Sequence, residues 1–112
     1  MRIAIVTNDM HPSNGGPPRV VLGHALELRN RGLEPEIIST FPDGQERSTR
    51  EAWPELDEAG IPMHLFPRSG YGPMGRSRAL ARYLEGLDHD RFDVMHLHGM
   101  WELCLATAAG FA

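Results

Sequence analysis

The sequence predicts an α/β fold with a parallel, doubly wound sheet, and three observations lead to this prediction. Short apolar runs alternate with stretches of helical periodicity along the chain. The first apolar run, residues 2–7, continues into a loop rich in glycine and proline and then into a helical pattern. A second apolar run follows at residues 36–40, so strand, helix and strand form a βαβ unit. Such units close right-handed on a parallel sheet in nearly all known proteins.

The first helix is expected over residues 17–31. Its opening prolines suit a first helical turn, where a missing N–H costs nothing. Gly32 is expected to end the helix, because the residue after a helix often has a left-handed backbone, which glycine adopts easily. Glu27 and Arg31 are spaced for an ion pair one turn apart. One buried stripe is predicted from apolar residues at helical spacing: Val21, Leu22, Ala25, Leu26 and Leu28.

The rest of the chain continues the alternation of strands and helices. A surface loop is expected over residues 41–53, because that segment is polar and rich in turn formers. Beyond it, the pattern predicts a short helix at 54–60, a third strand at 62–66, a long irregular connection at 67–75, a helix at 77–87, a fourth strand at 93–98 and a last helix starting at 102.

Four strands alternating with helices are typical of a Rossmann-like doubly wound sheet. Ligands bind such sheets at the carboxyl ends of the strands, near the point where the strand order reverses. The first and fourth strands would be neighbours there, so loops 8–18 and 98–102 would face each other across one crevice. In the first loop, Gly15 and Gly16 precede a helix N-terminus, where backbone N–H groups can face an anion.

Composition limits the domain count and the classes of partner. A chain of 112 residues forms one small domain or part of a larger one. The net charge of −4 argues against a general nucleic-acid binder. The single Cys104 excludes an intramolecular disulfide and fits a cytoplasmic protein. No apolar run approaches the roughly 18 residues of a membrane span. The sequence stops inside an apolar helical pattern at 102–112, so either the natural product ends within its architecture or this is a piece of a longer protein.

Several runs, in order along the chain, resemble the family 4 glycosyltransferases of the GT-B fold. They are Asn14–Val21, Leu28–Gly32, Gly70–Gly72 followed by Ser77–Leu84, and Asp93–Glu102. The resemblance implies two Rossmann-like domains with the active site in the cleft between them. The first domain of that family mostly holds the acceptor, and the second mostly holds the nucleotide sugar.

By this resemblance, residues 1–112 would be the first half of a GT-B N-terminal domain, and the C-terminal donor-binding domain would be absent. The family's Arg/Lys pair and paired glutamates, which grip the donor in the second domain, have no counterpart here. The resemblance implies retaining transfer of a sugar from a nucleotide sugar to a sugar or lipid acceptor. The nucleotide sugar is then a substrate, and neither a cofactor nor a metal is implied.

The resemblance also gives roles to individual residues. Gly15 and Gly16 match the family's glycine loop, which implies contact with the donor diphosphate or the acceptor. Arg19, in the first helical turn, could add a bidentate grip on phosphate. His98 matches the family histidine at the exit of the fourth strand, which implies a catalytic role beside the transferring sugar. A plain strand-to-helix turn and a solvated arginine are the alternatives for the first three.

His96 and His98 stand two residues apart on a predicted strand and therefore share one face. Besides the role above, the pair could bind a metal, with Glu102 or His11 as a third ligand. Both could instead be core histidines with satisfied hydrogen bonds. For His96 this core interpretation is preferred.

Acceptor contacts are expected from residues in the crevice loops. Asn8, Asp9 and His11 could hydrogen-bond acceptor hydroxyls, although short polar residues are also ordinary loop formers. Tyr71 and Trp101 could stack on a sugar face, or could serve as lids or domain contacts.

The leading hypothesis is therefore a fragment of a retaining glycosyltransferase that is inactive alone. The alternative is a non-catalytic remnant or binding module that keeps the half-sheet. The expected partners are the nucleotide sugar, the acceptor and the missing C-terminal domain, with no nucleic acid. Three arginines on one predicted helix leave open a peripheral contact with the inner face of an acidic membrane: Arg76, Arg78 and Arg82. A solvated helix face is the preferred interpretation of these charges.

Overall fold

The computed structural model describes residues 1–12, 16–41, 44–68, 77–87 and 91–98 of the chain. Strands and helices alternate over most of its length. In chain order the elements are β1 (Arg2–Asp9), α1 (Gly16–Asn30), β2 (Glu34–Phe41), α2 (Glu46–Glu51), α3 (Pro54–Glu58), β3 (Met63–Pro67), α4 (Arg78–Glu85) and β4 (Val94–His98).

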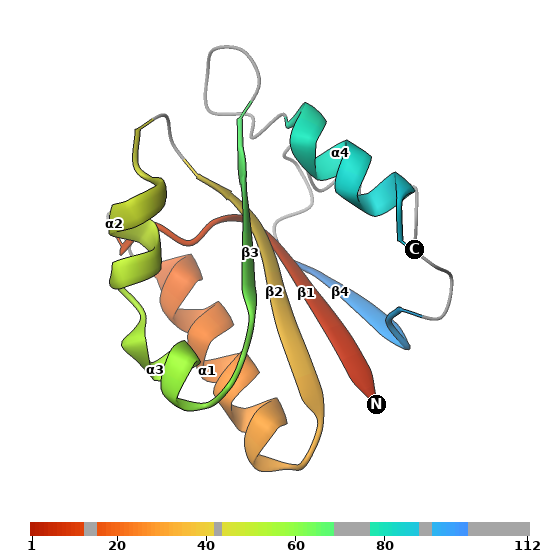
Figure 1. Ribbon diagram of the computed structural model, residues 1–112. Helices are drawn as coiled ribbons and strands as arrows, with labels where there is room; N and C mark the ends of the chain where they lie inside the picture. The colour runs from red at the N-terminus through yellow and green to blue at the C-terminus, as the bar shows by residue number, and fades with distance from the viewer. Residues whose placement is uncertain (13–15, 42–43, 69–76, 88–90, 99–112) are drawn as a thin grey trace.

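The four strands form one parallel sheet in the order β3-β2-β1-β4 (Figure 1). This confirms the predicted Rossmann-like α/β fold and the predicted contact between the first and fourth strands. The order reverses at β1, because the chain first builds outward through β2 and β3 and then returns to add β4 on the other side of β1. Ligands of open α/β sheets bind at such a reversal.

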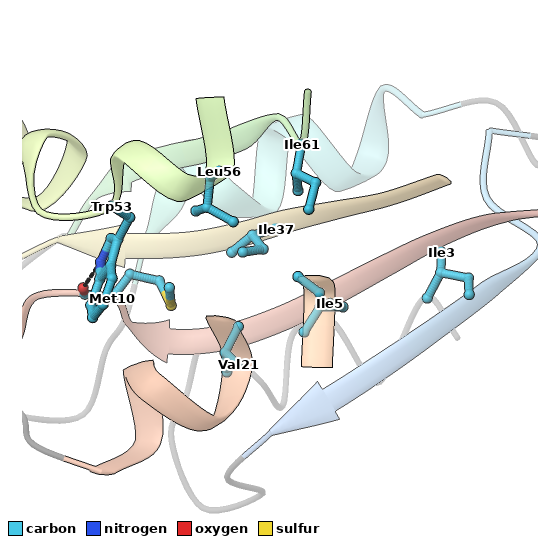
Figure 2. Close-up of a cluster of buried hydrophobic side chains, with 9 residues drawn as sticks. Ile3, Ile5, Met10, Val21, Ile37, Trp53, Leu56 and Ile61 are labelled. Carbon is cyan, nitrogen blue, oxygen red and sulfur yellow. Dashed lines mark hydrogen bonds between the residues drawn. The ribbon is translucent and has the colours of Figure 1, made fainter. Parts of the chain in front are cut away.

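Helices cover both faces of the sheet: α1, α2 and α3 lie on one face and α4 on the other (Figure 1). Successive side chains of a strand point to opposite faces, so β1 supplies both cores. Ile3 and Ile5 pack with Val21 of α1 on the first face (Figure 2). Ala4 and Val6 pack on the second face, with helix α4. Because β1 is covered on both faces, consecutive residues of the strand are apolar, which explains the continuous apolar run in the sequence.

The ends of the helices follow local chemistry that the sequence shows. Gly32, after α1, has a φ of +84°, a value that residues with a Cβ rarely adopt. The predicted ion pair between Glu27 and Arg31 forms at 2.9 Å. At α4, the Ser77 hydroxyl accepts a hydrogen bond from the Leu80 amide at 3.1 Å and donates one to the Pro67 carbonyl at 2.7 Å. One side chain therefore caps the helix and ties it to β3.

A second side chain, that of Arg50, hydrogen-bonds a backbone carbonyl at the outer edge of β3. The Ile37 amide donates to the Pro62 carbonyl at 2.9 Å, so Pro62 faces β2. The alternation of a parallel ladder then turns the carbonyl of Met63 outward. The Arg50 guanidinium donates to that carbonyl at 3.0 Å. Two carbonyls of this edge, those of Met63 and Pro67, are thus occupied by side chains of the same molecule.

One predicted element is wrong. Residues 41–53 were expected to be a surface loop, but residues 46–51 form helix α2. This helix has no apolar stripe, and pairs one turn apart support it: Arg47 contacts Glu51 at 2.9 Å and Arg50 contacts Glu46 at 3.6 Å. The helix predicted from residue 102 and most of the connection 67–75 lie outside the described residues.

Candidate functional site

The carboxyl ends of β1 and β4 lie side by side. Thr7 of β1 pairs with His98 of β4, and the pairing runs back to Ile3 and Val94. The backbone of His98 is therefore placed next to the loop that leaves β1, as the topology predicted. The loop expected at 98–102, which would face it, begins at this strand end and otherwise lies outside the described residues.

A bulge ends β1. Thr7 pairs with Ser39 and Asp9 with Thr40, so Asn8 is the extra residue between two regular pairs. The Thr40 hydroxyl donates a hydrogen bond to the Asn8 carbonyl and secures the bulge. Bulges are common beside active sites because they redirect the side chains that follow. Here the residue that follows is Asp9, which is buried.

One arginine joins the ends of three strands. Arg68 directly follows β3, and its guanidinium donates to the Asp9 carboxylate at 2.8 Å. The same guanidinium donates to the Thr40 hydroxyl at 3.2 Å and to the Asn8 carbonyl at 3.5 Å. The side chains of Arg68 and Asp9 are only 18% and 8% exposed. A charged pair that is this little exposed needs such additional hydrogen bonds to offset its lost hydration.

The segment after β1 is held by two further contacts. The second oxygen of the Asp9 carboxylate accepts a hydrogen bond from the His11 amide at 2.7 Å. The Met10 carbonyl accepts one from the Trp53 indole N–H at 2.6 Å, drawn as a dashed line in Figure 2. Met10 and Trp53 are both buried in the core beneath α1. The start of the crevice loop is therefore fixed by core packing on one side and by Asp9 on the other.

Gly16 is the first residue of α1 and lies at the predicted anion-facing end of the helix. A Cβ built at Gly16 would meet no atom of the described residues within 4 Å, and Gly16 is not among the described glycines with a positive φ. Within the described part of the chain, neither packing nor backbone conformation therefore requires glycine at this position. Arg19 lies in the first helical turn and is exposed.

A histidine pair joins α1 to β4. The rings of His24 and His96 meet edge to face, with their centroids 4.7 Å apart. Burial lowers the pKa of His24, and the neighbouring His96 lowers it further. His96 is exposed, so the expectation that it is a core histidine is wrong: β4 is an edge strand, and α1 covers this face only in part.

The structure brings some predicted residues together and leaves others outside its description. Asn8, Asp9 and His11 share the end of β1, next to the backbone of His98. The predicted contacts of Gly15, Tyr71, Trp101 and Glu102 lie outside the described residues. Within the described part of the chain, no three histidine, cysteine or acidic side chains gather as metal ligands.

Sequence reasoning missed Arg68 and Thr40. Both stand at carboxyl ends of predicted strands, which is the signal that could have found them. A groove of about 590 Å³ lies elsewhere, along β3, and its lining includes Trp53, His64 and Tyr83. None of the predicted site residues lines it, so the groove lies apart from the strand ends where the crevice is predicted.

Comparison with known proteins adds a family to this geometry. The model of the glycosyl transferase 4-like domain matches residues 15–112. No curated protein and no solved structure matches the chain. None of the described helices has the length and apolar character needed to cross a membrane. Because the family match covers most of the sequence, and the fold is the parallel α/β sheet that the resemblance implied, the chain belongs to the glycosyl transferase 4-like domain family.

Proposed function

We propose that this chain forms part of the acceptor-side domain of a retaining glycosyltransferase, which moves a sugar from a nucleotide-sugar donor to an acceptor. The donor would be held mainly by a further domain, so residues 1–112 alone would not catalyse transfer. Membership of the glycosyl transferase 4-like family supports this proposal. The proposal is also supported by the adjacent carboxyl ends of β1 and β4, which lie at the reversal of strand order where ligands of such sheets bind.

The observation that carries the donor contact is the unexplained glycine at position 16. Glycine has a high backbone entropy and no Cβ, so it gives a helix N-terminus no packing of its own but leaves its N–H groups accessible. No described residue fills the space beside Gly16, so a ligand could approach its backbone closely. The N-terminal N–H groups of α1 would then face the diphosphate, and Arg19 would add a charge-assisted grip. Gly15 would extend the same contact.

The remaining roles follow the family pattern. His98 would hydrogen-bond the transferring sugar, and preorganised N–H groups would stabilise the leaving diphosphate without a metal. Asn8 and His11 would contact acceptor hydroxyls, with Tyr71 and Trp101 stacking on the sugar face.

The decisive variant is Gly16→Ala in the full-length gene product, with Gly23→Ala as its matched control. Gly23 lies in the same helix and also has nothing within 4 Å of a built Cβ. Both changes should leave stability unchanged or raise it by less than about 1 kcal/mol. Gly16→Ala should lower nucleoside diphosphate release from UDP- or GDP-sugars by about 100-fold, because a methyl displaces the diphosphate from its reacting position.

Equal activity of the two alanine variants would remove the α1 N-terminus from the donor site. His98→Ala should abolish turnover in the same assay while the protein stays folded by circular dichroism. Full turnover in that variant would remove His98 from the mechanism.

A further inference from the structure

Arg68 directly follows β3, and its side chain contacts the ends of both β1 and β2. It bonds the Asp9 carboxylate, the Thr40 hydroxyl and the Asn8 carbonyl at 2.8, 3.2 and 3.5 Å. These partners lie 59, 28 and 60 residues away in the sequence. One guanidinium therefore links three strand ends at the edge where the crevice is predicted.

The charge of Arg68 is already matched. Asp9 neutralises it at hydrogen-bond distance, and both side chains are largely removed from solvent. An arginine used in this way offers a ligand little net charge, in contrast to the exposed Arg19. Its effect must pass through the group it holds. That group is Asp9, whose other oxygen receives the His11 amide.

We propose that Arg68 is a positioning residue of the crevice, acting through Asp9 to fix residues 9–11 where the chain leaves β1. This role rests on the proposed function, because it serves donor and acceptor binding by the loop that follows β1. The chain of contacts is continuous: Arg68 fixes one carboxylate oxygen, and the second oxygen fixes the His11 amide at 2.7 Å. Arginine suits the task because its planar fork reaches several acceptors at once, which a lysine ammonium does not do in fixed geometry.

The test uses Arg68→Met and Arg68→Lys in the gene product, with Arg47→Met as the matched control. Arg47 also pairs with a carboxylate, but its side chain is 90% exposed and lies on α2. Three quantities are measured for each variant: the unfolding midpoint, the exchange rate of the His11 amide, and the Kd for UDP and GDP.

Arg68→Met should speed exchange of the His11 amide and weaken nucleotide binding by about tenfold, as loss of a supporting contact does at other sites. Arg68→Lys should recover part of both effects, and Arg47→Met should change neither. If Arg68→Met lowers only the unfolding midpoint, with exchange and Kd at wild-type values, the positioning role is wrong.

A second variant guards against loss of folding in Arg68→Met. Asp9→Asn keeps the size of the side chain and removes its charge, so it should reproduce both changes. The double variant should be no worse than either single one, because both act through one contact; additive losses would contradict the proposal. If wild type binds neither nucleotide, the proposed donor site fails, and the exchange rate of His11 still decides the role of Arg68.

Discussion

Two buried carboxylates stand at opposite ends of the sheet, and their partners differ in kind. Asp9, at the carboxyl ends, is held by Arg68 and in turn holds a backbone amide of the loop. Glu36, near the amino end of β2, accepts hydrogen bonds from two side chains, His64 and Arg91, each at 2.7 Å.

The difference shows how one kind of contact serves two purposes. Glu36 ties β2 to β3 through His64 and to the segment before β4 through Arg91, so it joins regular elements of the fold. Tyr83 of α4 stacks on His64 with the ring centroids 5.4 Å apart and extends this contact to the helix. Asp9 instead connects the end of β1 to the loop that follows, because its carboxylate binds Arg68 through one oxygen and the His11 amide through the other. We therefore expect the Glu36 cluster to govern stability and the Asp9 cluster to govern binding.

Replacing Glu36 is expected to give the largest loss of stability. Glu36→Gln keeps the shape and one acceptor oxygen but removes the negative charge that pairs with Arg91 and His64. Breaking a buried ion pair costs roughly 3–5 kcal/mol. Arg91 and His64 are 34% and 30% exposed and can turn partly to water. We expect a loss of about 2 kcal/mol in urea unfolding, with UDP binding unchanged. Weaker UDP binding at unchanged stability would reverse the comparison.

Acid should weaken the same interaction gradually, as a growing share of Glu36 becomes protonated. At moderately acid pH, the loss of unfolding free energy should therefore be smaller than that of Glu36→Gln. Burial raises the pKa of Glu36, but hydrogen bonds from Arg91 and His64 outweigh it and hold the pKa below its ordinary value of 4.5. A lowered carboxyl pKa contributes stability that is complete above the unfolded pKa and is lost as the pH falls through the folded one.

The difference in unfolding free energy between wild type and Glu36→Gln should therefore be constant well above pH 4.5 and shrink below it. Urea titrations of both proteins at a series of pH values measure it. A difference that grows in acid would mean that the ionised carboxylate is not the stabilising form.

The smallest effect is expected at an exposed pair on α2. Arg47 and Glu51 meet at 2.9 Å, but their side chains are 90% and 65% exposed. Water and salt screen such a pair, so Arg47→Met should change the unfolding free energy by less than about 0.5 kcal/mol. A loss as large as that of Glu36→Gln would show that burial is not what separates these contacts.

The fold could be predicted because its signals are local. Apolar runs gave all four strands, and Gly32 marked the end of α1 where its φ is positive. Helix α2 was missed because its support comes from ion pairs and from Thr49, buried against the rest of the protein, and not from an apolar stripe. Periodicity cannot detect such a helix.

The candidate site could be predicted only in part. Asn8, Asp9 and His11 were found because they follow the first strand directly. The partner of Asp9 could not be found, because Arg68 is 59 residues away and its neighbours carry no sign of the pairing. The bulge at Asn8 is likewise set by pairing with β2 and has no signature in β1 alone. The roles of His98, Tyr71 and Trp101 stay predictions.

The side chains of Arg50 and Ser77, bound to the outer edge of β3, affect how this sheet can be extended. A strand that joins a sheet needs free backbone acceptors along the edge, and at β3 the carbonyls of Met63 and Pro67 already serve Arg50 and Ser77. Pro67 also has no backbone N–H to donate to an added strand. Addition of a further strand is thereby disfavoured at β3, which leaves the β4 edge as the other side of the described sheet at which a strand could join.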